Sequence, residues 1–503
     1  MILDATKLTG PVTDEADYVI VGTGAAGAVA ARVLTESGAE VLLVEEGPYL
    51  APAALGQGTA AALTGLFRDR GAQITSRPPY IAILQGCCVG GSTVINSGIS
   101  WRPPEAVLGS WETDHGLAGV FPGDELESCF ATIEQELSVK RTDEDRLGGN
   151  GLALRRGAEK LGLAHQPTLR TESGCEGSGR CLEGCTRARR KSMNHSYIPR
   201  ALGAGARLYA GCRVDRVEVV GDRVRGVSGR FAAPVPRAPR YGFRAIARKA
   251  VLLAASAIHT PALLQRSGLH GSGQVGKHLQ GHPGAAMIGV FGEPIRMWEG
   301  ASQSYEVTQF RDRGIKIESL GLPPEMMAVR VPGMGEQLVS RLAGLDRLAL
   351  AAVPVRARAQ GTVTASGDSV RIDYTPTPED VTLILDGLRH TGEIFFAAGA
   401  SAVFPGIHGL PAELDRPADL RVLQEARVAP TALSWVMTHL MGTCRMGPDP
   451  ATSVVGPTGE VHGVSGLYVI DSSLFPTNLG VNPQHTILAI AMLLTRRLAA
   501  TSA

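Results

Sequence analysis

The chain lacks the features that mark membrane, secreted and nucleic-acid-binding proteins. No run approaches the roughly 18 consecutive apolar residues of a membrane-spanning helix. The first residues, MILDATKLTGPVTDEAD, have no basic segment followed by an apolar one. The formal net charge is only +1, which favours neither nucleic acid nor an anionic membrane as a partner. We therefore expect a cytoplasmic protein with no transmembrane segment and no nucleic-acid partner.

Cysteine and aromatic residues are also scarce. Eight cysteines in 503 residues are too few for a disulfide scaffold, so most are expected to be reduced thiols. Aromatic residues make up 5% of the chain, which argues weakly against a large apolar substrate pocket. The length and the 44% content of apolar residues predict a globular protein of two or three domains.

What the sequence does contain is a dinucleotide-binding pattern near its start. The stretch DYVIVGTGAAGAVAARVLTESGAEVLLVEEG predicts a strand, a glycine turn, a helix from about Ala25 and a second strand. Gly22 permits the tight turn, Gly24 lets a pyrophosphate approach the backbone, and Gly27 allows close helix packing. The helix start favours a phosphate, and Glu45 at the end of the second strand can accept hydrogen bonds from a ribose. An acid at this place disfavours NADP.

Alternating strands and helices at both ends of the chain predict a parallel sheet covered by helices, in a domain that is discontinuous in sequence. Residues 247–268 predict a strand over Val251–Ala255 and a helix entered at Pro261. LYVID at 467–471 predicts another strand, and TILAIAMLLTRRLA a final helix. Residues 206–230 predict short strands, and 231–242 an exposed loop. The middle of the chain, about 285–430, is expected to be the substrate domain.

Two polar residues near the end are the candidates for chemistry. His439 lies in THLMGTCRMG and Asn482 in LGVNPQHTI, 43 positions later. A histidine that titrates near neutral pH can accept an alcohol proton, and an amide can orient the same oxygen. His485 is a competing candidate, but a helix start at NPQHT would turn it away from Asn482.

Five blocks in one order resemble the glucose-methanol-choline (GMC) oxidoreductases, which are FAD-dependent alcohol oxidases and dehydrogenases. The blocks are GTGAAG with Glu45, LQGCCVGGSTVIN, AASAIHTPALL, VGKHLQGHP, and HLMGTCRMG through NPQHTILAIA. The resemblance implies an α/β fold, in which a discontinuous Rossmann-like FAD-binding domain is joined to an α+β substrate-binding domain built on an antiparallel sheet. The expected domains are 15–284 for the first FAD-binding part, 285–430 for the substrate-binding domain and 431–503 for the second FAD-binding part.

The resemblance also implies the cofactor-binding residues. Small residues let the backbone approach the flavin and its phosphates, although a plain glycine turn is the alternative for the GGS block. Asp471 resembles the acid beside the ribityl chain, with a simple helix cap as its alternative. His282, in GHP, is expected to be structural. The predicted set is Gly22, Gly24, Ala25, Ala26, Gly27, Glu45, Glu46, Gly86, Gly90, Gly91, Ser92, Asn96, Val214, Ala255, Asp471, Asn482 and Pro483.

The predicted reaction is oxidation of a CH–OH group by hydride transfer to flavin N5, with His439 as the base and Asn482 as the orienting partner. A sugar, a polyol or another hydroxylated natural product is the expected substrate. The electron acceptor, which could be oxygen, a quinone or a carrier, is left open. The alternatives are a flavin-containing lyase of the same fold, which performs no redox reaction, and an NAD-dependent two-domain dehydrogenase.

A cysteine-containing loop at 172–192 has no place in this scheme. Cys175, Cys181 and Cys185 lie in GCEGSGRCLEGC, and three thiolates at this spacing could surround a metal. The spacing resembles that of the three-iron cluster in certain flavin-dependent sugar dehydrogenases, and also a loop in long-chain alcohol oxidases. An iron-sulfur cluster is therefore a candidate second cofactor. The alternative is a loop with free thiols or one disulfide, and a zinc site lacks a convincing fourth ligand.

Overall fold

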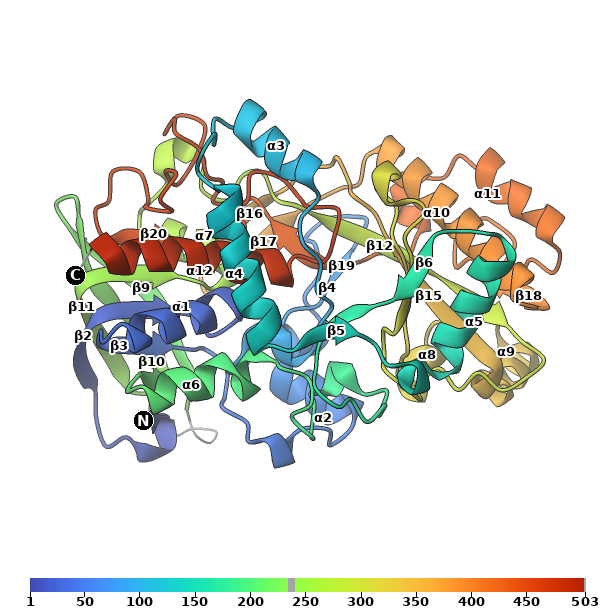
Figure 1. Ribbon diagram of the computed structural model, residues 1–503, viewed down its shortest axis with the longest axis horizontal. Coiled ribbons are helices and arrows are strands. Elements are labelled where there is room, and N and C mark those ends of the chain that lie inside the picture. The colour runs from blue at the N-terminus through green and yellow to red at the C-terminus, as the bar shows by residue number, and fades with distance from the viewer. Residues whose placement is uncertain (234–239, 502–503) are drawn as a thin grey trace.

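The computed structural model describes residues 1–233 and 240–501, which form two large sheets lying side by side (Figure 1). In this view the first sheet lies at the left and the second at the right. The predicted α/β class with an antiparallel second sheet is confirmed. Half of the loop predicted over 231–242, residues 234–239, lies outside the described residues, and its end residues Phe231 and Gly242 belong to strands.

The first sheet has the parallel core of a nucleotide-binding domain. Its strands are β1 (Ile2–Leu3), β8 (Arg207–Tyr209), β3 (Val41–Val44), β2 (Val12–Val21), β11 (Gly242–Leu253), β10 (Arg223–Phe231) and β9 (Cys212–Val220), in that spatial order, with β20 (Leu467–Val469) also beside β11. β2 pairs in parallel with β3 and β11, and β11 pairs in parallel with β20. Strands from both ends of the chain therefore belong to one sheet, as the sequence predicts.

Helices cover this sheet because its central strands are apolar on both faces. Val19, Ile20 and Leu42 are fully buried, as expected for parallel strands between helical layers. The covering helices include α1 (Ala25–Glu36), α6 (Tyr197–Gly203) and α12 (Gln484–Thr501), which run alongside one another in Figure 1. The predicted helix starts near Ala25 and at NPQHT are confirmed.

One helix boundary differs from the prediction. The helix expected to begin at Pro261 is α7 (Ser256–Arg266), so the proline lies inside it. A proline has no N–H to donate to the carbonyl four residues earlier, here Ala257. The hydroxyl of Thr443 donates to that carbonyl at 2.6 Å. A side chain distant in sequence thus supplies the missing hydrogen bond and makes the proline tolerable.

The second sheet is mostly antiparallel. Its strands, in spatial order, are β4 (Ala82–Ile83), β19 (Val436–Met441), β12 (Gln280–Val290), β15 (Leu348–Pro354), β14 (Ile317–Ser319), β13 (Tyr305–Val307) and β6 (His165–Pro167), with β18 (Ala402–Phe404) also beside β12. Three of these strands, β4, β6 and β19, come from outside the predicted substrate-binding domain, 285–430. The predicted domain boundaries stay predictions. β19 carries His439 and pairs with β12, which carries His282.

The remaining elements surround the two sheets. They are the pairs β5 (Val139–Arg141) with β7 (Leu169–Thr171) and β16 (Thr362–Ser366) with β17 (Ser369–Asp373), and the helices α2 (Thr59–Leu66), α3 (Glu105–Asp114), α4 (Gly123–Glu136), α5 (Gly148–Lys160), α8 (Pro324–Ala328), α9 (Gly335–Ala343), α10 (Pro378–Ala397) and α11 (Arg421–Glu425).

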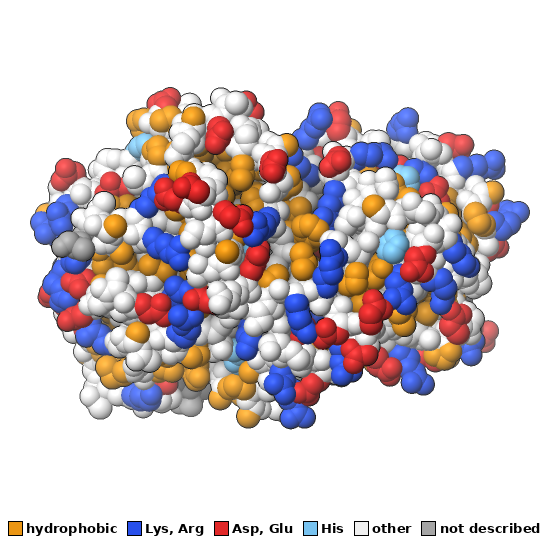
Figure 2. Space-filling model, viewed as in Figure 1, with side chains coloured by type: hydrophobic (Ala, Val, Ile, Leu, Met, Phe, Trp, Pro, Cys, Tyr) orange, Lys and Arg blue, Asp and Glu red, His pale blue; other side chains and the backbone are white. Residues whose placement is uncertain are grey.

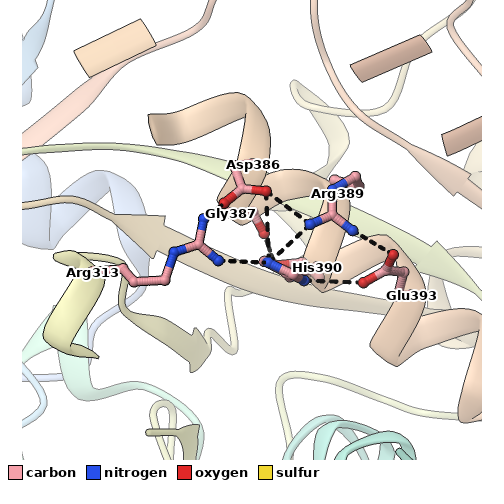
Figure 3. Close-up of polar contacts among 7 residues, drawn as sticks. Arg313, Asp386, Gly387, Arg389, His390 and Glu393 are labelled. Atoms are coloured by element: carbon pink, nitrogen blue, oxygen red, sulfur yellow. Dashed lines mark hydrogen bonds and ion pairs between the residues drawn. The ribbon is translucent and has the colours of Figure 1, made fainter. Parts of the chain in front are cut away.

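A charged cluster ties the long helix α10 to a neighbouring turn (Figure 3). His390 lies between Arg313 from that turn and three residues of its own helix, Asp386, Arg389 and Glu393. The His390 Nδ1 is 3.0 Å from a Glu393 oxygen. Such partly exposed ion pairs fix geometry more than they add stability.

The described helices include none long and apolar enough to cross a membrane. The cytoplasmic location stays a prediction. On the face shown in Figure 2, basic and acidic side chains are interspersed rather than gathered by sign, in keeping with the small net charge.

Candidate active site

A cavity of about 820 Å³ runs from the glycine turn of the first sheet to the second sheet. One end is lined by Gly22 and Glu45, which directly follow the parallel strands β2 and β3, and by Val214 of β9. The other end is lined by residues of β12, β14, β15 and β19, among them His439. A ligand that fills the cavity would therefore contact both predicted domains, which suits an elongated dinucleotide with a substrate beside it.

The three positions of the turn require glycine for different structural reasons. A Cβ on Gly22, whose φ is +100°, would lie 2.4 Å from the Ala254 carbonyl oxygen. A Cβ on Gly27 would lie 2.0 Å from the Gly22 carbonyl oxygen. A Cβ on Gly24 would meet no protein atom within 4 Å, and Gly24 lines the cavity. Gly22 and Gly27 are thus required by packing, whereas Gly24 keeps space open at the start of α1.

Glu45 holds the glycine turn in place. Its Oε2 accepts hydrogen bonds from the Thr23 N–H at 3.0 Å and the Thr23 hydroxyl at 2.7 Å, and its Oε1 accepts from the Gly47 N–H at 2.9 Å. Burial raises the pKa of Glu45, against these hydrogen bonds. A carboxylate offers about four acceptor positions, so capacity remains for a ribose hydroxyl at the cavity wall.

Glu46 is paired with Arg68, a residue the sequence did not single out. The Arg68 guanidinium lies 2.8 Å from a Glu46 oxygen, and both residues line the cavity. Burial alone would raise the pKa of Glu46, but the hydrogen bond and charge of Arg68 outweigh burial and lower that pKa to about 2. Glu46 is therefore an anion at neutral pH and already has a counter-charge.

The second glycine-rich segment packs on the first. A Cβ on Gly91 would lie 2.9 Å from Gly24 Cα, so the two backbones touch. The Ser92 hydroxyl accepts from the Gly86 N–H at 3.0 Å, and Asn96 Nδ2 donates to Gln484 Oε1 at 2.6 Å. These side chains shape the cavity wall and connect it to the start of α12.

Most of the predicted cofactor residues line the cavity, and two do not. Gly27 and Gly90 lie outside its lining; a Cβ on Gly27 would meet the Gly22 carbonyl, and one on Gly90 would meet Val94 and Asn194, so both serve close packing. Asp471 lines the cavity and also accepts hydrogen bonds from Ser473 N–H at 2.8 Å and the Thr260 hydroxyl at 2.6 Å, so it is a helix cap as well. The lining includes Gly22, Gly24, Ala25, Ala26, Glu45, Glu46, Gly86, Gly91, Ser92, Asn96, Val214, Ala255, Asp471, Asn482 and Pro483.

His439 and Asn482 come together on the cavity wall. Asn482 Nδ2 lies 3.4 Å from His439 Nε2, and both residues face the cavity. The Asn482 Oδ1 is buried without a hydrogen-bond partner among the described residues. An unpartnered buried amide oxygen at a cavity wall is a place for a ligand donor, because burial without a partner is costly.

His282 touches His439, although the sequence indicated a merely structural residue. Their Nδ1 atoms are 3.1 Å apart, and the Gly480 N–H donates to His282 Nε2 at 2.8 Å. Because Nε2 is an acceptor, neutral His282 carries its proton on Nδ1 and donates it to His439. That contact favours a proton on His439 Nε2, whereas the Asn482 Nδ2 can only donate and favours a lone pair there, so the two neighbours of His439 favour opposite tautomers.

The electrostatics keep His439 uncharged at neutral pH. Burial lowers the pKa of His439 to about 4, and the positive charge of Lys316 acts in the same direction. Burial, together with His439, also holds the pKa of His282 well below its usual value. A neutral imidazole has the lone pair that a general base needs.

The substrate end of the cavity carries a buried carboxylate. Glu318, on β14, accepts a hydrogen bond from Gln303 Nε2 at 2.9 Å and contacts Lys316 Nζ. Glu318 and Gln303 both line the cavity, together with apolar side chains such as Leu320 and Met326. This end is therefore amphipathic, with one charged acceptor.

Comparison with known proteins decides the family. Residues 16–284 match the N-terminal sequence profile of GMC oxidoreductases, and residues 357–491 match the C-terminal one. The chain belongs to the GMC oxidoreductase family. It is thus an FAD-dependent enzyme of the alcohol oxidase and dehydrogenase class, as predicted, and the alternative of an NAD-dependent two-domain dehydrogenase is not supported.

Relatives of this GMC oxidoreductase match nearly the whole chain. An uncharacterised GMC-type oxidoreductase of Mycobacterium tuberculosis is 33% identical over 96% of this chain and 75% of its own length. A long-chain-alcohol oxidase of Arabidopsis thaliana is 30% identical over 97% of this chain and 69% of its own length. A solved variant of the formate oxidase of Aspergillus oryzae, studied for its effect on FAD modification, is 16% identical, has a TM-score of 0.71, and the match covers 97% of this chain and 98% of that one.

The cysteine loop does not support an iron-sulfur cluster in this GMC oxidoreductase. The described residues contain no group of three or more histidines, cysteines or acids that could hold a metal ion. The buried Arg170 instead lies against two of the sulfur atoms, at 3.8 Å from Cys175 and 3.5 Å from Cys181. All eight cysteines are free thiols, so the predicted alternative of free thiols describes the loop.

His485 is turned away from the cavity, as predicted. Its ring stacks on Phe130 at 5.0 Å, and its Nε2 lies 3.1 Å from a Glu134 oxygen. Both partners belong to α4, so His485 fastens α12 to α4.

Sequence reasoning missed Thr23, Arg68, Gln303 and Glu318. Thr23 stands inside the predicted turn and could have been found as a hydroxyl beside Glu45. Gln303 and Glu318 lie in a region with no recognisable block, so only the folded sheet reveals them.

Proposed function

We propose that this GMC oxidoreductase oxidises a CH–OH group of a small hydroxylated molecule at the His439 end of the cavity. The observation that carries the proposal is the pairing of a neutral, half-buried histidine with a buried amide whose oxygen has no partner among the described residues, both on the cavity wall. His439 takes the hydroxyl proton and Asn482 fixes the oxygen. When bound, FAD supplies the acceptor for the hydride that leaves the same carbon.

The residues present suit FAD. Gly24 leaves open space at the start of α1 for a pyrophosphate, and Glu45 stands where a ribose could be held. Ser92 and Asn96 offer polar atoms along the middle of the cavity, and Val214 lines the far end beside Glu46.

The contact from His282 makes the tautomer of His439 a specific requirement of the proposal. A proton acceptor at His439 Nε2 needs its lone pair there, whereas the hydrogen bond from His282 favours a proton on Nε2. The contact from Asn482 Nδ2, a donor, favours that lone pair, so the base role requires the His439 ring proton on Nδ1 in the alcohol complex, with His282 no longer donating to that nitrogen. Nitrogen-15 NMR of ring-labelled histidine, with an unreactive alcohol analogue bound, tests this: a protonated Nε2 in that complex contradicts the base role.

The pH dependence of flavin reduction should show a depressed histidine pKa. Since the pKa of His439 is about 4, His439 is neutral above that pH and protonated below it. We expect the rate constant for anaerobic flavin reduction to stay level from neutral pH down to about 4 and then to fall about tenfold for each further pH unit. Stopped-flow absorbance measures the rate, and circular dichroism confirms that the protein is folded. A break at the ordinary histidine pKa near 6.5 contradicts the assigned environment.

Glu318 supports a substrate with a second hydroxyl. Its carboxylate faces the same cavity as His439 and can accept one more hydrogen bond. We expect Glu318→Gln to raise KM for a sugar or polyol roughly 10- to 100-fold, because a hydrogen bond to a charged group contributes about 1.5–3 kcal/mol. Steady-state kinetics with the polyol and with a simple monohydric alcohol measure the effect.

The monohydric alcohol is the control for this variant. It has no second hydroxyl, so its KM should be unchanged by Glu318→Gln. Equal changes for both alcohols would show that the substitution perturbs the cavity as a whole, for instance by leaving Lys316 without its partner.

Purified protein and a panel of alcohols test the whole proposal. We expect a yellow protein whose flavin is bleached anaerobically by at least one hydroxylated compound. A flavin that stays oxidised while a hydroxynitrile is cleaved would establish the lyase alternative instead.

A further inference from the structure

The cysteine loop carries a feature that alcohol oxidation does not use. Arg170, fully buried, directs its two terminal nitrogens at two different thiols: Nη1 lies 3.8 Å from Cys175 Sγ and Nη2 lies 3.5 Å from Cys181 Sγ. The sulfur atoms of Cys175 and Cys181 thus both lie against the terminal nitrogens of one guanidinium group. The remaining Arg170 donor, Nε, bonds the Ser97 carbonyl at 2.8 Å.

A second buried arginine adds to the positive charge. Arg190 donates to the Cys181 carbonyl at 3.0 Å and to the Val94 carbonyl, and its own N–H lies 3.5 Å from Cys185 Sγ. The hydrogen bonds of both guanidinium groups go to carbonyls and sulfur, and the buried Glu172 acts on Arg170 through its charge alone. A thiolate is the anion that this arrangement favours, because a buried cation stabilises a negative partner.

The thiol of Cys181 differs from the other cysteines in the direction of its pKa shift. Burial alone would raise the pKa of Cys181, but the charges of Arg170 and Arg190 outweigh burial and lower that pKa. Burial raises the pKa of Cys87, Cys88, Cys129, Cys212 and Cys444. Cys181 is thus the thiol with the clearest thiolate character, and the thiolate is the nucleophilic form.

The two cysteines are accessible, and the backbone between them turns at glycine. Cys175 and Cys181 are both partly exposed. Gly177 and Gly179, which lie between the two cysteines, both have positive φ angles near +70°, the left-handed region that favours glycine. Leu182, next to Cys181, lines the large cavity. The thiol of Cys181 is therefore only one residue away from the wall of the cavity.

We propose that Cys181 and Cys175 form a peroxide-reactive dithiol, in which Cys181 is attacked first and Cys175 resolves it. The Cys181 thiolate displaces hydroxide from hydrogen peroxide, breaking the O–O bond and becoming a sulfenic acid. The Cys175 sulfur then attacks that sulfur and the sulfenic oxygen leaves as water, so a Cys175–Cys181 disulfide forms. Peroxide is reduced by two electrons, and the two thiols are oxidised by two.

Peptide mapping by mass spectrometry on the FAD-loaded enzyme, after a brief exposure to dilute hydrogen peroxide, tests the proposal. We expect a Cys175–Cys181 disulfide and the loss of two thiols per chain. Cys175→Ser should stop at a sulfenic acid on Cys181, which dimedone labels. Cys181→Ser should slow oxidation of the loop by on the order of tenfold or more.

Cys185→Ser is the matched control, since its sulfur belongs to the same loop but contacts a backbone N–H and not a guanidinium. It should form the disulfide as the native enzyme does. Three outcomes overturn the proposal: a disulfide that includes Cys185, oxidation of Cys175 at the native rate in Cys181→Ser, or iron bound at the loop in the purified enzyme. Because the readout is thiol chemistry, it is independent of whether the enzyme oxidises an alcohol.

Discussion

Replacing His439 by alanine is expected to leave FAD bound and to slow its anaerobic reduction by substrate about 10²- to 10⁴-fold, the range of general base catalysis. The histidine contacts Asn482 and His282 and lines the cavity, but within the described part of the chain it makes no hydrogen bond to the glycine segments. Removing it should therefore affect chemistry and not cofactor retention. Stopped-flow reduction and the flavin-to-protein absorbance ratio measure the two quantities.

The control for this variant is His270→Ala, because His270 is exposed on the surface. It should reduce its flavin at the native rate. Native reduction rates in His439→Ala would contradict the assignment of the base, whereas loss of flavin from it would indicate a structural role at the cofactor.

Replacing Gly24 by valine is expected to abolish FAD binding while the protein still folds. A Cβ at this position meets no protein atom within 4 Å, so the added side chain has space in the protein alone. That space is the part of the cavity at the start of α1 where the pyrophosphate is expected. The purified variant should be colourless, and its affinity for added FAD should fall by several orders of magnitude, as flavin fluorescence titration would measure.

Two other glycines separate cofactor loss from misfolding. Gly292→Val, on the surface and also without atoms within 4 Å of a Cβ, should stay yellow. Gly27→Val should lower thermal stability or prevent folding, because its Cβ would lie 2.0 Å from the Gly22 carbonyl oxygen. A yellow Gly24→Val enzyme would place the pyrophosphate elsewhere.

Local patterns were enough to predict the first half of the site. The apolar run before Gly22, the glycine spacing and Glu45 lie within one βαβ unit, so their geometry follows from neighbours in sequence. The same is true of the helix start that turns His485 away from Asn482. The predicted start of α7 was wrong because it depends on a residue distant in sequence. A proline inside a helix is excluded by local rules, and the Thr443 hydroxyl that makes it acceptable lies in another part of the chain.

The substrate end of the site could not be predicted, because it depends on sheet pairing. Glu318 reaches the cavity since β14 pairs with β15 in a register that places it opposite Ala352. His282 meets His439 because β12 and β19 are adjacent strands. Nothing in the spacing of these residues along the chain signals either contact, since antiparallel registers between distant segments leave no periodic trace.

The late position of β20 has a consequence for how the protein is made. β11 leaves the ribosome long before β20, so the end of β11 that borders the glycine turn waits without its partner strand during most of translation. Exposed strand edges invite wrong pairing, and chaperones would have to shield this one. A chain truncated before β20 would leave this end of β11 without its partner strand. We expect such a chain to fold incompletely and to be degraded by quality-control proteases.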